Sequence, residues 1–480
     1  MCFLVNSTKT RGRKELTVPK KHNAFIKKQK GKGITTEGKM LKVLKFGGSS
    51  LADSTQFAKV KGIVESEACR EAVIVSAPGK RNSGDSKITD LLYLVHAHIK
   101  YGVSCDHILD MIKDRYVEIK ESCGLKTDIA KIIDDTFAEI DKSTSVDHIV
   151  SRGEYFCAIL MAEYLGYSFI DAADWLVFDY NGKVDDKKSE ARLREYKNIY
   201  EKIVTPGFYG AYPSGEIRVF PRGGSDITGA LAAAYLRADI YENWTDVSGI
   251  LMVDPRIVKN PKTIARVTYD ELRELSYMGA SVLHEDTVFP VRIKDIPVNI
   301  RNTNSPDDPG TIIGEKFDDE LKEEHERFIT GITGKKDYSI INIYKTKIGE
   351  NKIRLLRQVL EVFDRYEIPV EQVPSGVDSF SVVFPTGSLK ARKYDLLHEL
   401  QENENIDNCE LTEGISLIAI VGRQMAYRTG ISGRIFKALG DKKINIRTIE
   451  QGADEINIMI GVYTEDFERT IRILYESFAL

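Results

Sequence analysis

From residue 41 onward, short apolar runs alternate with longer segments whose apolar side chains recur every three or four positions. The short runs predict strands at residues 41–46, 72–76, 215–220, 239–244 and 298–302. The longer segments predict helices, including 54–68 and 87–100. Strands that alternate with helices in this way are typical of a parallel sheet covered by helices, so we expect an α/β fold.

The last third of the chain changes character and contains a weak internal repeat. Four pairs of segments match, the last three at one offset of 76 positions: 339–343 with 416–420, 359–363 with 435–439, 368–370 with 444–446, and 380–384 with 456–460. Each unit predicts the order strand, helix, strand, strand, helix, close to a ferredoxin-like βαββαβ domain. We therefore expect two small units after one large domain.

The composition is that of a folded protein with two or three domains. The chain has 480 residues, of which 42% are hydrophobic and 29% charged, which excludes a disordered chain. It lacks the run of about 18 apolar residues that a membrane helix needs, so no membrane partner is expected. The net charge of −4 disfavours nucleic acid as a partner.

The cysteines and histidines are scattered along the chain. The six cysteines form no CxxC and no close pair: Cys2, Cys69, Cys105, Cys123, Cys157 and Cys409. A disulfide framework or a structural zinc site needs closer spacing, so we expect reduced thiols, a cytoplasmic location and no metal held by the protein alone.

The first 39 residues differ in charge from the rest. They carry 11 of the 68 Lys and Arg side chains but only Glu15 and Glu37 among the 72 acidic ones. The segment has neither the apolar core of a secretory signal nor the Arg- and Ser-rich character of a transit peptide. An arm for nucleic acid or an acidic surface is one interpretation. We favour a disordered tail, or sequence upstream of a start at Met40.

Two glycine-rich loops each stand between a predicted strand and a predicted helix. The first, KFGGSS at 45–50, offers Lys45 and two glycines to an anion at a helix N-terminus. The second, FPRGGSD at 220–226, frames a glycine pair with Arg222 and Asp226. Neither is a P-loop. A tight turn explains the first alone, and a capped turn the second, but together they favour a substrate with several anionic groups.

Two further segments carry polar groups suited to a ligand. The tetrapeptide SRGE at 151–154 combines a cation with the carboxylate of Glu154, as a zwitterionic amino acid requires. On its own, a surface turn is the favoured interpretation of this tetrapeptide. Residues 244–246 and 254–256 place Thr245, Asp246 and Arg256 after a strand, where α/β sheets bind ligands.

These motifs, in this order, resemble those of the aspartate kinases in the amino-acid kinase family. The similarity covers residues 40–480, and KFGGSS, RGGSD and TDVSGI with DPR carry it. The resemblance implies an αβα sandwich kinase domain at 40–314, a helical connector at 315–327 and two ACT units at 328–400 and 401–480. A strand at 328–333 would be shared with the second unit. It also implies transfer of the ATP γ-phosphoryl group to the side chain of L-aspartate, the first step toward lysine, threonine and methionine.

The same resemblance implies a role for each matching residue. Lys45, Arg222 and Asp226 would be catalytic, with Lys45 neutralising the transferring group and Asp226 organising the site. L-aspartate would contact Thr89, Glu154 and Arg222. ATP, with its bound Mg²⁺, would contact a larger set: Lys45, Gly47, Gly48, Ser49, Thr245, Asp246, Arg256, Ser281 and Val282.

Three positions depart from the family pattern. Pro221 stands where Gly commonly precedes the Arg, Leu251 replaces a frequent aromatic, and Ser281 replaces a common Lys near ATP. Two rival functions therefore stay open. One is a kinase of the same fold acting on another carboxylate, and the other is an amino-acid sensor that has lost turnover.

ACT units imply an amino-acid effector, lysine alone or with threonine, and at least a homodimer. The segment IPVEQVPSGVD at 368–378 offers Glu371 or Asp378 to the effector ammonium and N–H groups near Ser375 to its carboxylate. Ordinary strand–turn–strand chemistry explains the same residues.

Overall fold

The computed structural model describes most of the chain after residue 39. The described residues are 40–221, 223–279, 283, 285–315, 329–346, 352–389, 392–423, 425, 429–452 and 456–478. The expected disordered head and nearly all of the expected connector therefore lie outside them. Arg222, Ser281 and Val282 lie outside them as well. No helix among the described residues is long and apolar enough to cross a membrane.

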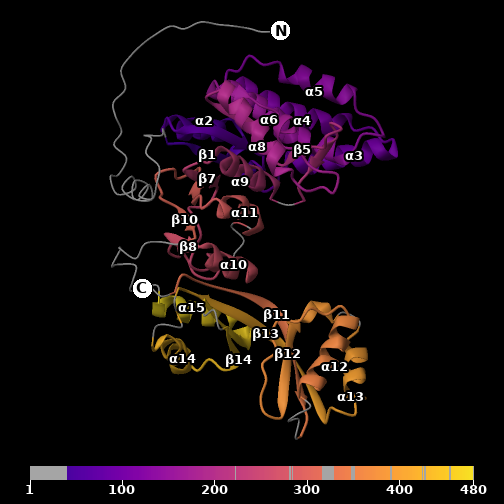
Figure 1. The fold of residues 1–480 in the computed structure, drawn as a ribbon, viewed down its shortest axis with the longest axis vertical. Coiled ribbons are helices and arrows are strands. Elements are labelled where there is room, and N and C mark those ends of the chain that lie inside the picture. The colour runs from indigo at the N-terminus through magenta and orange to yellow at the C-terminus, as the bar shows by residue number, and fades with distance from the viewer. Residues whose placement is uncertain are drawn as a thin grey trace. The chain divides into compact units, whose positions relative to one another are not determined.

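The first domain is built on an eight-stranded sheet with the order β3-β4-β2-β1-β7-β9-β10-β8. Neighbouring strands from β3 through β9 are parallel, and only the β9–β10 pair is antiparallel. The strands are β1 Lys42–Phe46, β2 Arg70–Val75, β3 Ser168–Phe169, β4 Ile203–Pro206, β7 Ile240–Thr245, β8 Arg266–Thr268, β9 Val298–Asn302 and β10 Thr311–Gly314. The expectation of a mostly parallel sheet is confirmed, and Figure 1 shows helices around it.

One predicted strand lies outside this sheet. The apolar run 215–220 forms β6 (Ile217–Val219), which pairs antiparallel with β5 (Tyr209–Ala211) in a separate two-stranded sheet. Only the short turn 212–216 separates the two strands. Because a parallel partner requires a long crossover connection, such a turn enforces a hairpin.

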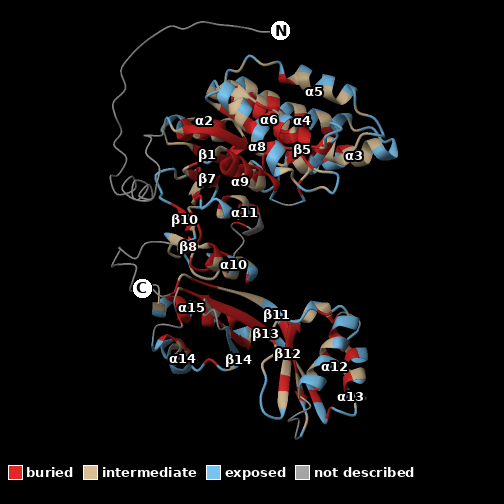
Figure 2. Cartoon of the chain, viewed as in Figure 1, coloured by how far each residue is buried: buried red, intermediate tan, exposed pale blue. Residues whose placement is uncertain are grey.

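Helices cover both faces of the central strands. They are α2 Ser54–Glu65, α3 Ile88–Tyr101, α4 Asp106–Ser122, α5 Ile129–Ala138, α6 Val146–Leu165, α7 Ala172–Trp175, α8 Asp186–Ile199, α9 Gly224–Leu236, α10 Tyr269–Tyr277 and α11 Glu285–Ile293. Leu44 and Phe46 of β1 pack into one apolar cluster with residues of α2, α3, α4 and α6. Val43, one residue before Leu44 and therefore on the opposite face of the strand, packs into another cluster with residues of α9. All five residues of β1 are buried (Figure 2). Because alternate side chains of a strand point to opposite faces, β1 is covered on both.

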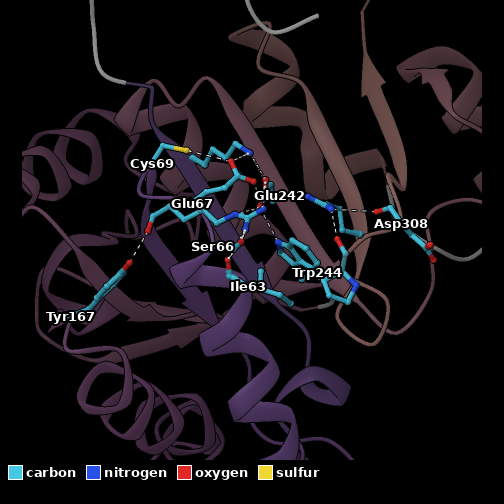
Figure 3. Close-up of polar contacts among 12 residues, drawn as sticks. Ile63, Ser66, Glu67, Cys69, Tyr167, Glu242, Trp244 and Asp308 are labelled. Atoms are coloured by element: carbon cyan, nitrogen blue, oxygen red, sulfur yellow. Dashed lines mark hydrogen bonds and ion pairs between the residues drawn. The ribbon is translucent and has the colours of Figure 1, made fainter. Parts of the chain in front are cut away.

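The three central strands are joined by buried charges (Figure 3). The carboxylate of Glu242, in β7, accepts hydrogen bonds from Lys42 Nζ at 2.9 Å and Arg70 Nε at 2.9 Å. Trp244 Nε1 donates to the same carboxylate at 3.0 Å, and Glu67 pairs with both cations. Burial alone would raise the pKa of Glu242, but Arg70 and Lys42 outweigh it and lower that pKa to about 2. The carboxylate is therefore ionised throughout the physiological range.

The C-terminal part forms one antiparallel sheet with the order β12-β11-β13-β15-β14. Its strands are β11 Gly331–Tyr344, β12 Ser379–Pro385, β13 Asn408–Val421, β14 Ile446–Gln451 and β15 Asn457–Tyr463, and its helices are α12 Lys352–Arg365, α13 Lys393–Gln401, α14 Ile431–Asp441 and α15 Phe467–Phe478. Two strands, β11 and β13, are 14 residues long and pair along their length. The start of β11 lies beside residues 417–421, whereas its end lies between β12 and residues 408–412. The sheet thus continues across the expected division at 400/401.

The internal repeat is visible in matching contacts. Ser339 Oγ lies 2.8 Å from Thr386 Oγ1 in the first unit, and Ser416 Oγ lies 2.9 Å from Thr464 Oγ1 in the second. In both units a short 3₁₀ turn at the end of a strand supplies the threonine. Segments matched by sequence therefore occupy equivalent places in the sheet.

Replacing Glu242 with Gln should destabilise the first domain. Glu242→Gln leaves the buried cations of Lys42 and Arg70 with Glu67 alone, at a cost of about 3–5 kcal/mol in the free energy of unfolding. Urea denaturation at neutral pH measures this loss. Asp441→Asn is the control, because it breaks an exposed ion pair with Lys437 that contributes about 0.5 kcal/mol or less. Equal losses in the two variants would contradict the role given to Glu242.

Candidate active site

The first glycine-rich loop leaves the carboxyl end of β1 and closely approaches the loop after β2. Gly48 O accepts a hydrogen bond from Gly79 N at 2.8 Å. A Cβ on Gly48 would stand 2.9 Å from Ala77 O, and one on Gly79 would stand 2.7 Å from Gly48 C. Both positions therefore need glycine because backbone meets backbone there.

The same loop also lies beside the end of β7. Gly47 N donates to Trp244 O at 3.0 Å, and Gly48 begins a short 3₁₀ helix that contains Ser49. In that helix, Ser50 Oγ lies 2.7 Å from Thr303 Oγ1, whose backbone N–H donates to Thr245 O. The structure thus brings Gly47, Gly48 and Ser49 next to Thr245.

Lys45 and Asp226 form the charged centre of the site. Lys45 Nζ lies 2.8 Å from Asp226 Oδ1, and the lysine is buried in the middle of the sheet. Asp226 stands in the first turn of α9, where the helix dipole favours a negative charge. Gly223, just before α9, has a φ of 60°, a left-handed conformation that suits glycine. Arg222 belongs to the same loop but lies outside the described residues.

Glu154 points its carboxyl group into the same region from α6. The residue is buried, the N–H of Ala77 donates to it, and its Oε2 has no hydrogen-bond partner. Burial raises the pKa of Glu154 to about 8, although the Ala77 N–H and the charges of Arg152 and Lys45 act in the opposite direction. A buried carboxylate oxygen without a partner is costly, so it is suited to a cationic ligand group.

The interpretation of residues 151–154 as a surface turn is wrong. Ser151, Arg152, Gly153 and Glu154 are all buried within α6. The reason is close packing: a Cβ on Gly153 would stand 2.9 Å from Ala77 Cβ and 3.2 Å from Ile88 Cγ2. Ile88 begins α3, so this contact also places Thr89, half-buried in the first turn of α3, close to the Glu154 segment.

Three of the predicted nucleotide residues line a cavity of about 740 Å³, whereas Lys45, Gly47, Gly48 and Ser49 are not among its lining residues. Thr245, Asp246 and Arg256 face it, together with Leu251 and Gly279. The Arg256 side chain is 88% exposed and pairs with Asp254 at 2.6 Å. Ser281 and Val282 follow Gly279 in the chain but lie outside the described residues.

Residues of the C-terminal sheet and of α15 form the other wall of this cavity. Ile332, Thr333, Gly334 and Lys336 of β11 contribute, as do Phe467, Glu468 and Ile471 of α15. Ile332 N donates to Met252 O at 2.7 Å, and Thr333 Oγ1 donates to Met278 O at 3.1 Å. The candidate nucleotide cavity is therefore built in part from β11 and α15.

The three predicted effector residues lie in the segment beside β12. Glu371 N donates to Val383 O, and its Oε2 accepts the hydroxyl of Tyr277 at 3.0 Å. Ser375 forms a β-bridge with Phe380, and Asp378 O accepts from Lys345 N. Tyr277 is the last residue of α10 and stands two residues before Gly279, which lines the cavity. Glu371 therefore contacts the first domain close to that cavity.

Sequence reasoning missed three residues that shape this site. Asn243 Nδ2 donates to Asp226 Oδ1 at 2.7 Å, and Gly79 lies against the first loop. Arg115 holds the Gly79 loop, donating to Gly79 O at 3.0 Å and pairing with Asp85 at 2.6 Å. A Pro-Gly pair directly after a predicted strand was the signal for Gly79, whereas the sequence holds no signal for the other two.

The described residues contain no group of three or more His, Cys, Asp or Glu side chains placed to hold a metal ion. Mg²⁺ commonly binds through one or two carboxylates and substrate phosphates, which does not require such a group of side chains.

Comparisons with known proteins agree with this arrangement. Residues 40–302 match the amino acid kinase family and 418–478 match the ACT domain. Aspartokinase 3 of Bacillus subtilis (strain 168) is 35% identical over 454 residues, which cover 91% of this chain and 98% of that protein. The aspartate kinase structure from Clostridium acetobutylicum is 46% identical, with a TM-score of 0.84 over 92% of this chain and 100% of that one.

Escherichia coli aspartokinase III is a more distant relative, 26% identical to this chain. Its complex with aspartate and ADP gives a TM-score of 0.67, over 92% of this chain and 100% of that one. Its complex with lysine and aspartate gives 0.69, over 91% and 99%.

A methyl group at Gly79 should disturb the loop contact that shapes the site. In Gly79→Ala, the added Cβ would stand 2.7 Å from Gly48 C and 2.8 Å from Gly48 O, so backbone must move. We expect a loss of about 1–3 kcal/mol in the free energy of unfolding. Gly62→Ala is the control, since nothing lies within 4 Å of its Cβ and alanine favours the helix by about 1 kcal/mol. Chemical denaturation of both variants should give changes of opposite sign; two losses of equal size would refute the close contact.

Proposed function

Because this chain belongs to the aspartokinases of the amino acid kinase family, we propose that its active site lies at the carboxyl ends of β1, β2 and β7. The chain is an aspartate kinase: it transfers the γ-phosphoryl group of ATP to the side-chain carboxylate of L-aspartate, giving 4-phospho-L-aspartate. Parallel sheets bind ligands outside the carboxyl ends of their strands, and the two glycine-rich loops lie there.

The observation that carries the assignment is the free, buried Oε2 of Glu154. The ammonium group of aspartate would supply the missing partner and would favour the ionised form of Glu154. Thr89 and Arg222 complete the proposed aspartate site, with Arg222 holding a carboxylate in a charge-assisted contact. An amino acid is therefore recognised at one end by an anion and at the other by a cation.

Lys45 is the proposed charge stabiliser of the transfer. The aspartate side chain has a pKa of about 3.9 and is already ionised at neutral pH, so the reaction needs no general base. The protein must instead hold two anions in line and offset the charge that moves between them. Lys45 Nζ, held at 2.8 Å from Asp226, lies beside the first glycine-rich loop and supplies a compact positive charge.

ATP is the proposed occupant of the cavity and the glycine-rich loop. Gly47, Gly48 and Ser49 would wrap the phosphates, with the backbone N–H groups of Gly48 and Ser49 as donors because that of Gly47 already donates to Trp244 O. Thr245, Asp246 and Arg256 would contact the rest of the nucleotide. Ser281 and Val282 stay part of this proposal. Mg²⁺, bound to the ATP phosphates, would offset their charge, and Asp226 is the nearby carboxylate suited to contact it.

The proposed regulation works through the ACT sheet. Glu371, Ser375 and Asp378 would bind lysine, alone or with threonine, and Glu371 also contacts Tyr277 of the first domain. E. coli aspartokinase III was solved with lysine, which supports an amino-acid effector. Pairing of ACT units between chains would make the enzyme at least a homodimer. The cytoplasmic location stays a prediction.

The pH dependence of aspartate use should reveal Glu154. Its pKa of about 8 means that the carboxyl group is mostly neutral below that pH and ionised above it. An ionised carboxylate is needed to bind the ammonium group, so kcat/KM for aspartate should rise with pH through about 8. The free-enzyme pKa appears in this parameter. Initial rates at saturating ATP over about pH 6 to 9 test the expectation.

Two variants on the same helix make this test specific. Glu154→Gln should abolish the rise and raise KM for aspartate with little change in that for ATP. Glu163→Gln should keep the wild-type profile. Glu163 lies further along α6, where its carboxylate accepts hydrogen bonds from the backbone N–H groups of Lys126 and Thr127. A flat profile in the wild type, or the same loss in both variants, would contradict the proposal.

Lysine inhibition should depend on Glu371. Glu371→Gln removes the charge proposed to pair with the effector ammonium, so half-inhibition should require about 5–150-fold more lysine, the range of typical allosteric couplings. Titrations with lysine, threonine and both together measure the shift. Glu361→Gln is the control, as Glu361 pairs with Arg357 on the exposed face of α12. No response of the wild type to any mixture would leave the ACT sheet without this role.

A further inference from the structure

The carboxylate of Asp226 receives two donors on the same oxygen. Lys45 Nζ lies 2.8 Å from Asp226 Oδ1, and Asn243 Nδ2 donates to this atom at 2.7 Å. Lys45 and Asn243 are direct neighbours in the register of β1 and β7, so both rise from the same face of the sheet. Asn243 is 4% exposed, whereas the side chain of Asp226 is 22% exposed.

The two donors differ in what they can do during turnover. The ammonium of Lys45 is a mobile charge that phosphoryl oxygens would attract, so its bond to Asp226 competes with its catalytic role. The amide of Asn243 carries no charge and is fixed on a buried central strand. Asn243 can therefore keep its hydrogen bond to Asp226 while Lys45 interacts with phosphate.

We infer that Asn243 is a positioning residue for phosphoryl transfer, because its amide fixes the Asp226 carboxylate that in turn places Lys45. The inference rests on the proposed function of Lys45 and Asp226 and adds a third member to their group. Without Asn243, Asp226 would be held by Lys45 alone and could rotate toward solvent. The site would then lose its alignment at the step when Lys45 shifts to the transferring group.

Other charged and titratable groups surround this carboxylate. The hydroxyl of Tyr241, also on β7, donates at 3.2 Å to the backbone carbonyl of Asp226, not to its carboxylate. Glu154, on α6, feels the charge of Lys45. Glu242 lies between Tyr241 and Asn243 in the strand, so its side chain points to the opposite face. Among the described residues, Lys45 and Asn243 are thus the side chains that hold the Asp226 carboxylate.

The first test replaces the amide by a group of similar size without a donor. Asn243→Leu should lower kcat by about tenfold to a hundredfold, the loss expected when a reacting group is held out of position. KM for ATP and for aspartate should change by less than about twofold, because neither substrate touches Asn243 in this scheme. Steady-state kinetics of the full chain with ATP, Mg²⁺ and aspartate measure these parameters.

The second test gives a readout that a merely structural residue would not affect. In Asn243→Asp, two carboxyl groups would face each other and share one proton, so the upper pKa of the pair would be raised. At low pH the shared proton restores the donor to Asp226; at high pH its loss leaves two anions that compete for Lys45. The kcat of this variant should therefore fall as pH rises, unlike that of the wild type. If Asn243→Leu fails to fold, this profile decides the matter.

Tyr241→Phe is the matched control. Tyr241 lies on β7, as Asn243 does, and also donates a hydrogen bond to Asp226. Its bond goes to the backbone carbonyl and not to the carboxylate, so the variant leaves the carboxylate contacts intact. Its kcat should stay near that of the wild type. An equal loss of kcat in Tyr241→Phe and Asn243→Leu, or a wild-type kcat in Asn243→Leu, overturns the inference. Lys45→Ala distinguishes a failure of this inference from a failure of the proposed function. If Lys45→Ala keeps wild-type turnover, the proposed function of Lys45 itself is wrong.

Discussion

The ionised carboxylate of Glu242 is the interaction on which the first domain depends. It lies in the sheet interior and binds Lys42 of β1 and Arg70 of β2 while it belongs to β7. Buried cations without an anion would be far more costly than the pairs they form, so the three strands must keep their order and register. Those strands end in the first glycine-rich loop, the Ala77–Gly79 loop and the Thr245 segment. By holding the three strands in place, the buried charges also determine the positions of the three loops that follow them.

The two faces of β1 and β7 carry different kinds of polar side chain. Alternation places Lys42, Glu242 and Trp244 toward α2 and α6, and Lys45 and Asn243 toward α9. The structural charges of Lys42 and Glu242 are thereby kept apart from Lys45, the proposed catalytic charge, although all three belong to two neighbouring strands. This separation lets Glu242 stay permanently paired while Lys45 remains available to a substrate. The pKa of Glu242, lowered to about 2, and that of Glu154, raised to about 8, reflect the contrast between a satisfied and an unsatisfied buried carboxyl group.

The cavity proposed to hold the nucleotide is lined both by the first domain and by the C-terminal sheet with its helix α15. The first domain packs against β11 and α15, and the cavity is lined by residues from both sides of this contact. A hydrogen bond from Ile332 N of β11 to Met252 O stabilises this contact. Arg423, which follows β13, adds a hydrogen bond to Glu271, a buried residue that also caps α10. An effector that alters the sheet can therefore alter the cavity without a long chain of intermediates. Its effect is bounded by the difference in its affinity for the two arrangements.

The sequence by itself determined the fold class, the tandem repeat and both glycine-rich loops, because these depend on periodicity and on local backbone demands. Chain order alone also placed Lys45 and Asp226 beside strand ends. Only the tertiary structure decided that residues 151–154 lie buried in α6, where Gly153 meets Ala77 and Ile88. It likewise decided that Asn243 meets Asp226 and that 215–220 forms a hairpin strand. Such contacts join residues distant in the chain, and they follow from strand order and close packing, which no local pattern of side chains records.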